Sequence, residues 1–348
     1  MAEHEIIIEV KNLKKYYPVR AKRANIFSRS KSKQAGILKA VDGITFIIER
    51  GKALGMAGES GCGKSTIGRM LLKLIEATDG EYFFNNVDVT NIKTKEDIKK
   101  FRKSAQLMFQ NPYEAINPRF TIYRALLEPL LNHNIGNTKD ERISIIKEIL
   151  EKVNLKPVEM YMEKYPHQMS GGQLQRVVLA RALIINPIFL VADEPVSMLD
   201  VSIRAGVLNL MKDINRKMNL TTLYISHDLS LIQYMCDETV IIYLGNIVEK
   251  GTTKNVLANP LHPYTKALIA AMPSMNPGEK AKELKINNSI AGPINLPQGC
   301  IFQRRCPYVS EKCKEKAPEM RKIEDNHFAA CYRITLTENL RGPLEKRA

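Results

Sequence analysis

The hydrophobic positions of the chain follow two periods, which predict alternating strands and helices. Short apolar or alternating runs predict strands over residues 5–10, 43–51, 54–58, 188–193 and 221–226. Apolar residues spaced three or four apart predict helices over residues 64–76, 94–103, 121–131, 138–153, 172–185 and 201–218. This alternation predicts an α/β fold with a largely parallel sheet, preceded by some antiparallel strands.

The pattern changes after about residue 258, where proline becomes frequent and the periodicity weakens. One more helix is predicted over residues 263–272, with a proline at its start. We therefore expect two parts, a large α/β domain over residues 1–258 and a smaller region over residues 259–348.

Composition narrows the class of protein. The chain has 348 residues, of which 44% are hydrophobic and 26% charged, as is ordinary for a globular protein. No apolar stretch reaches the roughly 18 residues of a spanning helix. The N-terminal MAEHEIIIEV carries acids where a secretory signal would carry bases. We therefore expect the chain in the cytoplasm.

The charge is strongly basic, with 52 Lys and Arg against 37 Asp and Glu. Such a surface attracts anions, for example nucleotides, nucleic acid or the cytoplasmic leaflet of a membrane. Much of the excess lies between Arg20 and Lys39, which we interpret first as an exposed loop and second as a binding patch.

The sequence GESGCGKST at 58–66 fits a phosphate-binding loop between a strand and a helix. Its glycines let backbone N–H groups turn toward one centre, Lys64 reaches the β- and γ-phosphates, and Ser65 can bind magnesium. Cys62 needs only to be small there, and we assign it no redox role. The predicted nucleotide contacts are Gly58, Ser60, Gly61, Cys62, Gly63, Lys64, Ser65 and Thr66.

A second part of such a site is an acid at the end of a buried strand, and IFLVADEP at 188–195 provides two. We expect Asp193 to hold magnesium through water and Glu194 to polarise the attacking water. The two motifs together predict hydrolysis of a nucleoside triphosphate.

With MSGGQLQR at 169–176 between these motifs, the set resembles the ATP-binding subunit of an ABC transporter. The resemblance implies a P-loop NTPase of ABC type, with an antiparallel β subdomain and a helical subdomain at about residues 111–186. It also implies ATP and Mg²⁺ as ligands. The signature that acts on the ATP of the opposite subunit is found as Ser170, Gly171, Gly172 and Gln173.

The other family positions follow one by one. Gln110 in MFQNP resembles the glutamine that senses magnesium and the γ-phosphate, and His227 in YISHD resembles the switch histidine, so both join Glu194 as expected catalytic residues. Asp200 in SMLD resembles the residue that communicates across the dimer. An aromatic side chain should stack on adenine, and strand alternation allows only one of Tyr16 and Tyr17, of which we favour Tyr17.

The segments NPLHPYTKALIAAMP at 259–273 and INLPQGCIFQRRCP at 294–307 resemble the C-terminal part of oligopeptide and dipeptide ABC importers. This implies a second related ATP-binding subunit, two transmembrane permease subunits, an extracellular peptide-binding protein, and a peripheral location on the cytoplasmic face of the membrane.

Other cargo, such as nickel, glutathione or an oligosaccharide, stays open, because the ATPase never touches the cargo. A nucleic-acid-acting ABC ATPase and an ATP-binding scaffold are the remaining alternatives. We expect no nucleic-acid partner, since that class usually carries two such domains, a coiled-coil insertion or zinc modules. None of these is visible in the sequence.

Four cysteines gather in the last part of the chain, at Cys300, Cys306, Cys313 and Cys331. A cytoplasmic location argues against disulfides. A segment with little apolar core of its own favours a bound metal that holds it together. The intervals of five, six and seventeen residues are wider than zinc pairs usually have, and Pro307 follows Cys306 as in one ferredoxin motif. Some importers of this branch hold a [4Fe–4S] cluster on this set, which we expect here, with zinc as the alternative.

Overall fold

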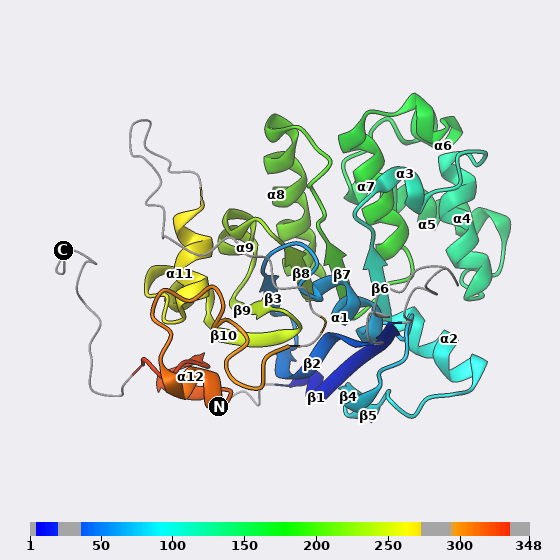
Figure 1. Ribbon diagram of the computed structural model, residues 1–348. Helices are drawn as coiled ribbons and strands as arrows, with labels where there is room; N and C mark the ends of the chain where they lie inside the picture. The colour runs from blue at the N-terminus through cyan, green and yellow to red at the C-terminus, as the bar shows by residue number, and fades with distance from the viewer. Residues whose placement is uncertain (1–4, 20–35, 273–293, 295, 335–348) are drawn as a thin grey trace, which may run out of the picture.

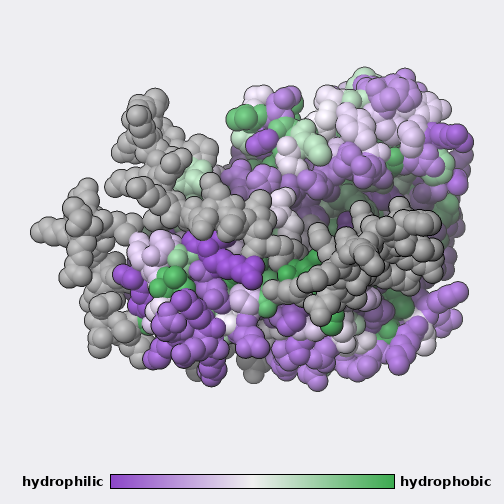
Figure 2. Space-filling view, in the orientation of Figure 1, coloured by the Kyte–Doolittle hydropathy of each residue, from purple (hydrophilic) through white to green (hydrophobic). Residues whose placement is uncertain are grey.

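The computed structural model describes residues 5–19, 36–272, 294 and 296–334, and it contains two β-sheets with helices around them (Figure 1). Residues 20–35, which carry most of the predicted basic loop, lie outside the described residues. No helix in the described parts of the chain has the length and hydropathy of a membrane span. The face shown in Figure 2 is mainly hydrophilic, with hydrophobic residues in small separate groups.

The first sheet is antiparallel, with the strand order β2-β1-β4-β5. Strands β1 (Ile6–Val19) and β2 (Gly36–Glu49) are both longer than the sequence predicted. The other two are β4 (Asp79–Phe84) and β5 (Val87–Asp88). The buried face of this sheet contributes to a core that it shares with α1 and the second sheet.

The second sheet has the order β11-β12-β10-β9-β3-β8-β7-β6. Its strands from β9 to β6 are parallel, and β10, β11 and β12 are added antiparallel. The bounds are β3 Ala53–Ala57, β6 Ala105–Met108, β7 Phe189–Asp193, β8 Thr221–Ser226, β9 Glu238–Tyr243, β10 Asn246–Thr252, β11 Arg321–Glu324 and β12 His327–Ala329. The predicted combination of a parallel core with antiparallel strands before it is confirmed.

The helices from α3 to α7 group on one side of the molecule, and α11 and α12 lie at the opposite end (Figure 1). The bounds are α1 Lys64–Leu71, α2 Lys95–Ser104, α3 Pro112–Ala115, α4 Ile122–Asn132, α5 Lys139–Lys152, α6 Val158–Glu163, a 3₁₀ turn Pro166–Gln168, α7 Gly171–Leu183, α8 Val201–Met218, α9 Leu229–Met235, α10 Thr253–Ala258, α11 Pro263–Ala270 and α12 Glu311–Glu315. The prediction of a helix to residue 76 was wrong. Helix α1 ends at Leu71 because Lys73 adopts a left-handed conformation with φ of 52°.

The chain after residue 258 is built onto the second sheet. Strand β12 pairs with β10, and Tyr264 and Phe302 are buried in the same core as the sheet and the helical group. The buried carboxylate of Glu249 in β10 accepts hydrogen bonds from the backbone N–H groups of Leu261 (2.9 Å) and His262 (2.8 Å). These contacts fix the C-terminal part to the rest of the fold. The boundary expected at residue 258 stays a prediction about domain organisation.

Candidate functional site

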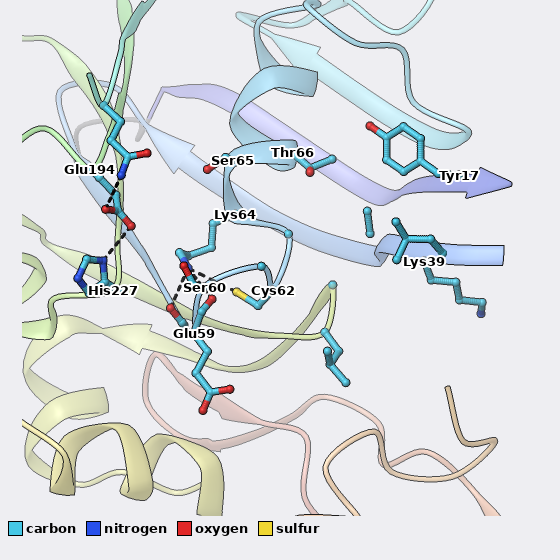
Figure 3. A pocket seen from close by; sticks show the side chains of 18 of the residues that line it. Tyr17, Lys39, Glu59, Ser60, Cys62, Lys64, Ser65, Thr66, Glu194 and His227 are labelled. Carbon is cyan, nitrogen blue, oxygen red and sulfur yellow. Dashed lines mark hydrogen bonds and ion pairs between the residues drawn. The ribbon is translucent and has the colours of Figure 1, made fainter. Parts of the chain in front are cut away.

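The candidate site is a cavity of about 660 Å³ where β3 leads into α1. Every residue from Gly58 to Thr66 lines it, so all eight predicted contacts of the phosphate loop face one space. Tyr17, Gln110, Glu194 and His227, which come from distant parts of the chain, line the same cavity (Figure 3).

The loop adopts a conformation that requires glycine. Gly58, Gly61 and Gly63 have φ angles of 155°, 78° and 106°. A Cβ atom on Gly63 would lie 2.2 Å from the carbonyl oxygen of Ala40, and one on Gly58 would lie 2.2 Å from that of Ile242. Because α1 begins directly after Gly63, its N-terminus faces the cavity, as suits the binding of an anion.

Lys64 is buried, and its ammonium group is held by the loop itself. Its Nζ donates to the carbonyl oxygens of Gly58 (2.7 Å) and Glu59 (2.8 Å) and lies 3.6 Å from Sγ of Cys62. Burial raises the pKa of the Cys62 thiol, although the nearby Lys64 charge opposes the shift. The loop therefore holds a positive charge beside a neutral thiol.

Ser65 lines the cavity, and its hydroxyl donates to Oδ1 of Asp193 at 3.1 Å, although Asp193 itself is not among the lining residues. Burial raises the pKa of Asp193, and the hydrogen bond from Ser65 works in the opposite direction. A hydroxyl and a carboxylate are oxygen ligands of the kind that Mg²⁺ prefers. The pair therefore fits the predicted magnesium site.

Glu194 is the centre of a three-residue cluster formed after strands β6, β7 and β8. Its Oε2 accepts from Nε2 of Gln110 at 3.0 Å, and its Oε1 lies 2.8 Å from Nδ1 of His227 (Figure 3). Its backbone is left-handed, with φ of 46°, and its N–H donates to the carbonyl of Ile225 at 2.8 Å. A strained backbone held by such a bond fixes the direction of the carboxylate.

The two adjacent tyrosines of β1 differ in role. Tyr17 lines the cavity, and its side chain is 36% exposed. Tyr16 is not among the lining residues, and its hydroxyl donates to the carboxylate of Asp42. This arrangement favours Tyr17 as the residue available for stacking.

The signature residues lie elsewhere. The hydroxyl of Ser170 accepts from the N–H of Gln173 at 3.4 Å and caps α7, and Gln173 Oε1 accepts from the N–H of Ser170 at 3.1 Å. Asp200 stands at the start of α8. Among the described residues, the lining of the cavity includes neither Asp200 nor any residue from Ser170 to Gln173.

Sequence reasoning missed Glu59 inside the phosphate loop and, outside the loop, Leu38, Lys39, Ala40, Leu244, Gly245 and Leu268. Leu268 belongs to α11, more than 200 residues after the phosphate loop. Outside the loop, no local pattern in the sequence marks these positions, because they reach the cavity only through the folding of distant strands and of α11.

The four cysteines line a second cavity of about 250 Å³, together with His262, Phe302 and Tyr308. No three or more His, Cys, Asp or Glu side chains in the described parts of the chain are grouped to hold a metal ion. A tetrahedral zinc ion would bring its sulfurs to within about 3.8 Å of one another, given Zn–S bonds of about 2.3 Å. The four thiols line one cavity but do not form such a metal-binding group in the described parts of the chain.

Three of the four cysteines of this cavity have a raised pKa. Burial, followed by the charges of the other cysteines, raises the pKa of Cys300 to about 11. Burial also raises the pKa of Cys306 and Cys331. Because a metal binds the thiolate form, its binding here would release protons.

Comparison with known proteins covers nearly the whole chain. Residues 41–197 match the family model of the ABC transporter, and residues 248–313 match that of the oligopeptide/dipeptide transporter C-terminal region. The chain is 41% identical to the oligopeptide transport ATP-binding protein AppF of Bacillus subtilis and 42% identical to the dipeptide transport ATP-binding protein DppF of Haemophilus influenzae. Each alignment covers 95% of this chain and 98% of the relative.

Among solved structures, the chain is similar to the dimeric structure of MJ0796, a bacterial ABC transporter cassette. The TM-score is 0.60 and the sequence identity 25%, over 71% of this chain and 99% of that chain.

Proposed function

We propose a function from one premise: this chain belongs to the family of ATP-binding subunits of oligopeptide and dipeptide ABC transporters. The predicted ABC-type P-loop fold and ATPase class are thereby confirmed. We propose that the chain binds and hydrolyses ATP to drive the import of di- or oligopeptides. The observation that carries hydrolysis is the meeting of Gln110, Glu194 and His227 beside the phosphate loop.

The loop binds the phosphates of ATP through its backbone N–H groups, the start of α1 and the charge of Lys64. Tyr17 stacks on the adenine. Ser65, Gln110 and Asp193 would hold Mg²⁺, which would supply positive charge that offsets the charge of the phosphates.

Glu194 acts on the water that attacks the γ-phosphorus. Its carboxylate accepts a proton from this water as the new P–O bond forms and the bond to the bridging oxygen of ADP breaks. Gln110 and His227 hold the carboxylate in position through the two contacts described above. His227 is also placed to contact the γ-phosphate from the end of β8.

We propose that the signature residues and Asp200 serve the ATP bound to a second, related subunit. Their position outside the cavity supports this. Met198 and Val201, which lie within two residues of Asp200, are 61% and 80% exposed, as suits a surface that a partner covers. The complex would include two transmembrane permease subunits and an extracellular peptide-binding protein, with this chain on the cytoplasmic face of the membrane.

The decisive variant is Glu194→Gln in the assembled transporter. We expect Kd for ATP to change by less than about threefold and steady-state hydrolysis to fall by roughly 10³-fold, since a positioned general base supplies about 10²–10⁴. Glu151→Gln, an exposed position in α5, makes the same change of charge and should leave turnover unchanged. Unchanged hydrolysis in Glu194→Gln would remove Glu194 as the catalytic residue.

The cargo is tested separately in proteoliposomes that contain the membrane subunits and the binding protein. Labelled di- and oligopeptides should accumulate only with ATP, and Glu194→Gln should stop their uptake. Uptake of nickel, glutathione or an oligosaccharide instead of peptide would replace the proposed cargo and keep the ATPase.

We also propose that Cys300, Cys306, Cys313 and Cys331 bind a [4Fe–4S] cluster with a structural or sensing role. The common cavity that the four thiols line supports this. Protein purified without oxygen should be brown, absorb in the visible range and contain about four iron atoms per chain. Colourless protein with one zinc ion per chain would contradict the cluster and establish zinc in its place.

A further inference from the structure

The phosphate loop makes an ion pair with the cysteine-rich segment. Nη1 and Nη2 of Arg305 donate to Oε2 and Oε1 of Glu59 at 2.7 Å and 2.8 Å. The two residues are 246 positions apart, and Arg305 directly precedes Cys306. Such a bidentate contact fixes both the distance and the orientation of the guanidinium relative to the carboxylate, which a single hydrogen bond does not.

Glu59 belongs to the phosphate loop and contacts its lysine directly. Its carbonyl oxygen accepts from Nζ of Lys64 at 2.8 Å, and its N–H donates to the hydroxyl of Tyr264 in α11 at 2.8 Å. The side chain, carbonyl and amide of Glu59 are thus all engaged. A displacement of Glu59 would move one of the two carbonyl groups that position the ammonium of Lys64.

Arg305 is itself rigidly placed. Its guanidinium lies 5.7 Å from the ring centroid of Tyr243 and 5.8 Å from that of Phe302, and its side chain is only 11% exposed. The rings of Tyr243, Phe302 and Tyr264 pack on one another. The side chain of Arg305 therefore has little room to move. A shift of the Arg305 backbone would shift Glu59, and with it the phosphate loop.

That backbone depends on the cysteines. The N–H of Cys300 donates to the carbonyl of Cys313 at 2.7 Å, and the N–H groups of Arg305 and Cys306 both donate to the carbonyl of Phe302 at 3.0 Å. The turn that carries Arg305 thus begins and ends at cysteines that line the second cavity. A change in how these cysteines are held together would move this turn.

We propose that Arg305 is a positioning residue for the phosphate loop, and that through it the cysteine cavity and the nucleotide site are energetically coupled. The inference rests on the proposed binding of ATP by this loop. Coupling of this kind is reciprocal, so bound nucleotide also stabilises the arrangement of the cysteines.

The first test measures Kd for MgATP on the full-length chain. Arg305→Ala should raise Kd by about tenfold, within the range usual for coupled sites. Arg304→Ala removes the same charge from the neighbouring exposed position and should leave Kd unchanged. Arg305→Lys keeps the charge but loses the bidentate contact and should give an intermediate value.

A double-mutant cycle separates the contact from general damage to the fold. Glu59→Gln and Arg305→Lys should each weaken MgATP binding, and the two together should weaken it no more than the stronger single change. The role of Arg305 would be overturned if the fold-changes in Kd of the two single variants multiplied in the double variant. Equal Kd values for Arg305→Ala and Arg304→Ala would overturn it as well.

The second test addresses the cysteines through Cys331→Ser, whose site lies 26 positions after Arg305 in the chain. This change should raise Kd for MgATP by about fivefold in the wild-type background and cause no further rise together with Arg305→Ala. An unchanged Kd, or a further rise in the double variant, would overturn the coupling.

Lys64→Ala shows which proposal has failed. If the wild type does not bind MgATP, or Lys64→Ala binds as well as the wild type, the nucleotide site itself is wrong. If the wild type binds, Lys64→Ala does not, and Arg305→Ala matches Arg304→Ala, only the present inference is wrong.

Discussion

His262 is a buried, uncharged histidine that begins a helix. Its side chain is 2% exposed, and its Nδ1 accepts a hydrogen bond from the N–H of Tyr264 at 3.0 Å, which caps α11. Burial lowers its pKa to about 3. An imidazole that must accept a hydrogen bond from the backbone cannot be protonated at that atom, so the cap requires the neutral form.

This histidine predicts a loss of stability in acid. Because the folded pKa is about 3 and the unfolded value about 6.5, the unfolded chain binds more protons in between. The unfolding free energy should therefore fall as pH drops below 6.5, by about 2 kcal/mol between pH 7 and pH 5. In His262→Asn, which keeps a side-chain acceptor without titrating, this contribution should disappear.

The measurement is the urea unfolding of both proteins at pH 7 and pH 5. His262→Leu, which has no acceptor, should be destabilised at both values of pH by about 1 kcal/mol for the lost cap. An equal loss of stability between pH 7 and pH 5 in the wild type and in His262→Asn would show that another group is responsible.

Single residues of the site were predictable where they belong to a short sequence motif. Lys64, Asp193 and Glu194 each lie in a motif that contains its own strand or helix boundary. Lys64 and Glu194 line one cavity, and Asp193 contacts Ser65 of its lining. Two residues were not predictable in this way: Leu268, and Arg305, which forms the ion pair with Glu59. Their places depend on the packing of α11 and the cysteine-rich segment, which no local spacing encodes.

At the scale of elements, long periodic helices and fully buried strands were predicted closely. Helix α8 and strand β8 have the bounds that their patterns predicted. The strands β9 and β10 were missed although they are well buried, because a turn of only two residues between them leaves one continuous mixed run. Strands β11 and β12 were missed for the opposite reason, since they are short and β11 consists mostly of charged residues.

At the scale of the whole molecule, the C-terminal part shares its core with the ATPase fold. Phe302 is 1% exposed and contacts the rings of Tyr243 in β9 and Tyr264 in α11. A buried side chain that joins two parts of a chain makes their unfolding cooperative. The region after residue 258 should therefore unfold together with the parallel sheet.

We predict that Phe302→Ala destabilises the whole chain by about 3–5 kcal/mol, the usual cost of such a deletion in a core. Val309→Ala, at a position that is 41% exposed in the same segment, should cost less than about 0.5 kcal/mol. Urea unfolding followed by circular dichroism should show one transition, shifted as a whole by Phe302→Ala. Two transitions, of which only the smaller one moves, would instead establish an independent domain after residue 258.

The antiparallel addition of β12 and β11 to the second sheet also bears on aggregation. In the described chain, β11 is the last strand on its side of the sheet, and it is four residues long, with Arg321, Lys322 and Glu324 exposed. Short charged strands of this kind discourage pairing with other molecules. Without them, the longer strand β10 would offer its unpaired backbone to any neighbouring chain. The cysteine-rich end of the protein thus also protects the sheet from intermolecular pairing during synthesis and assembly.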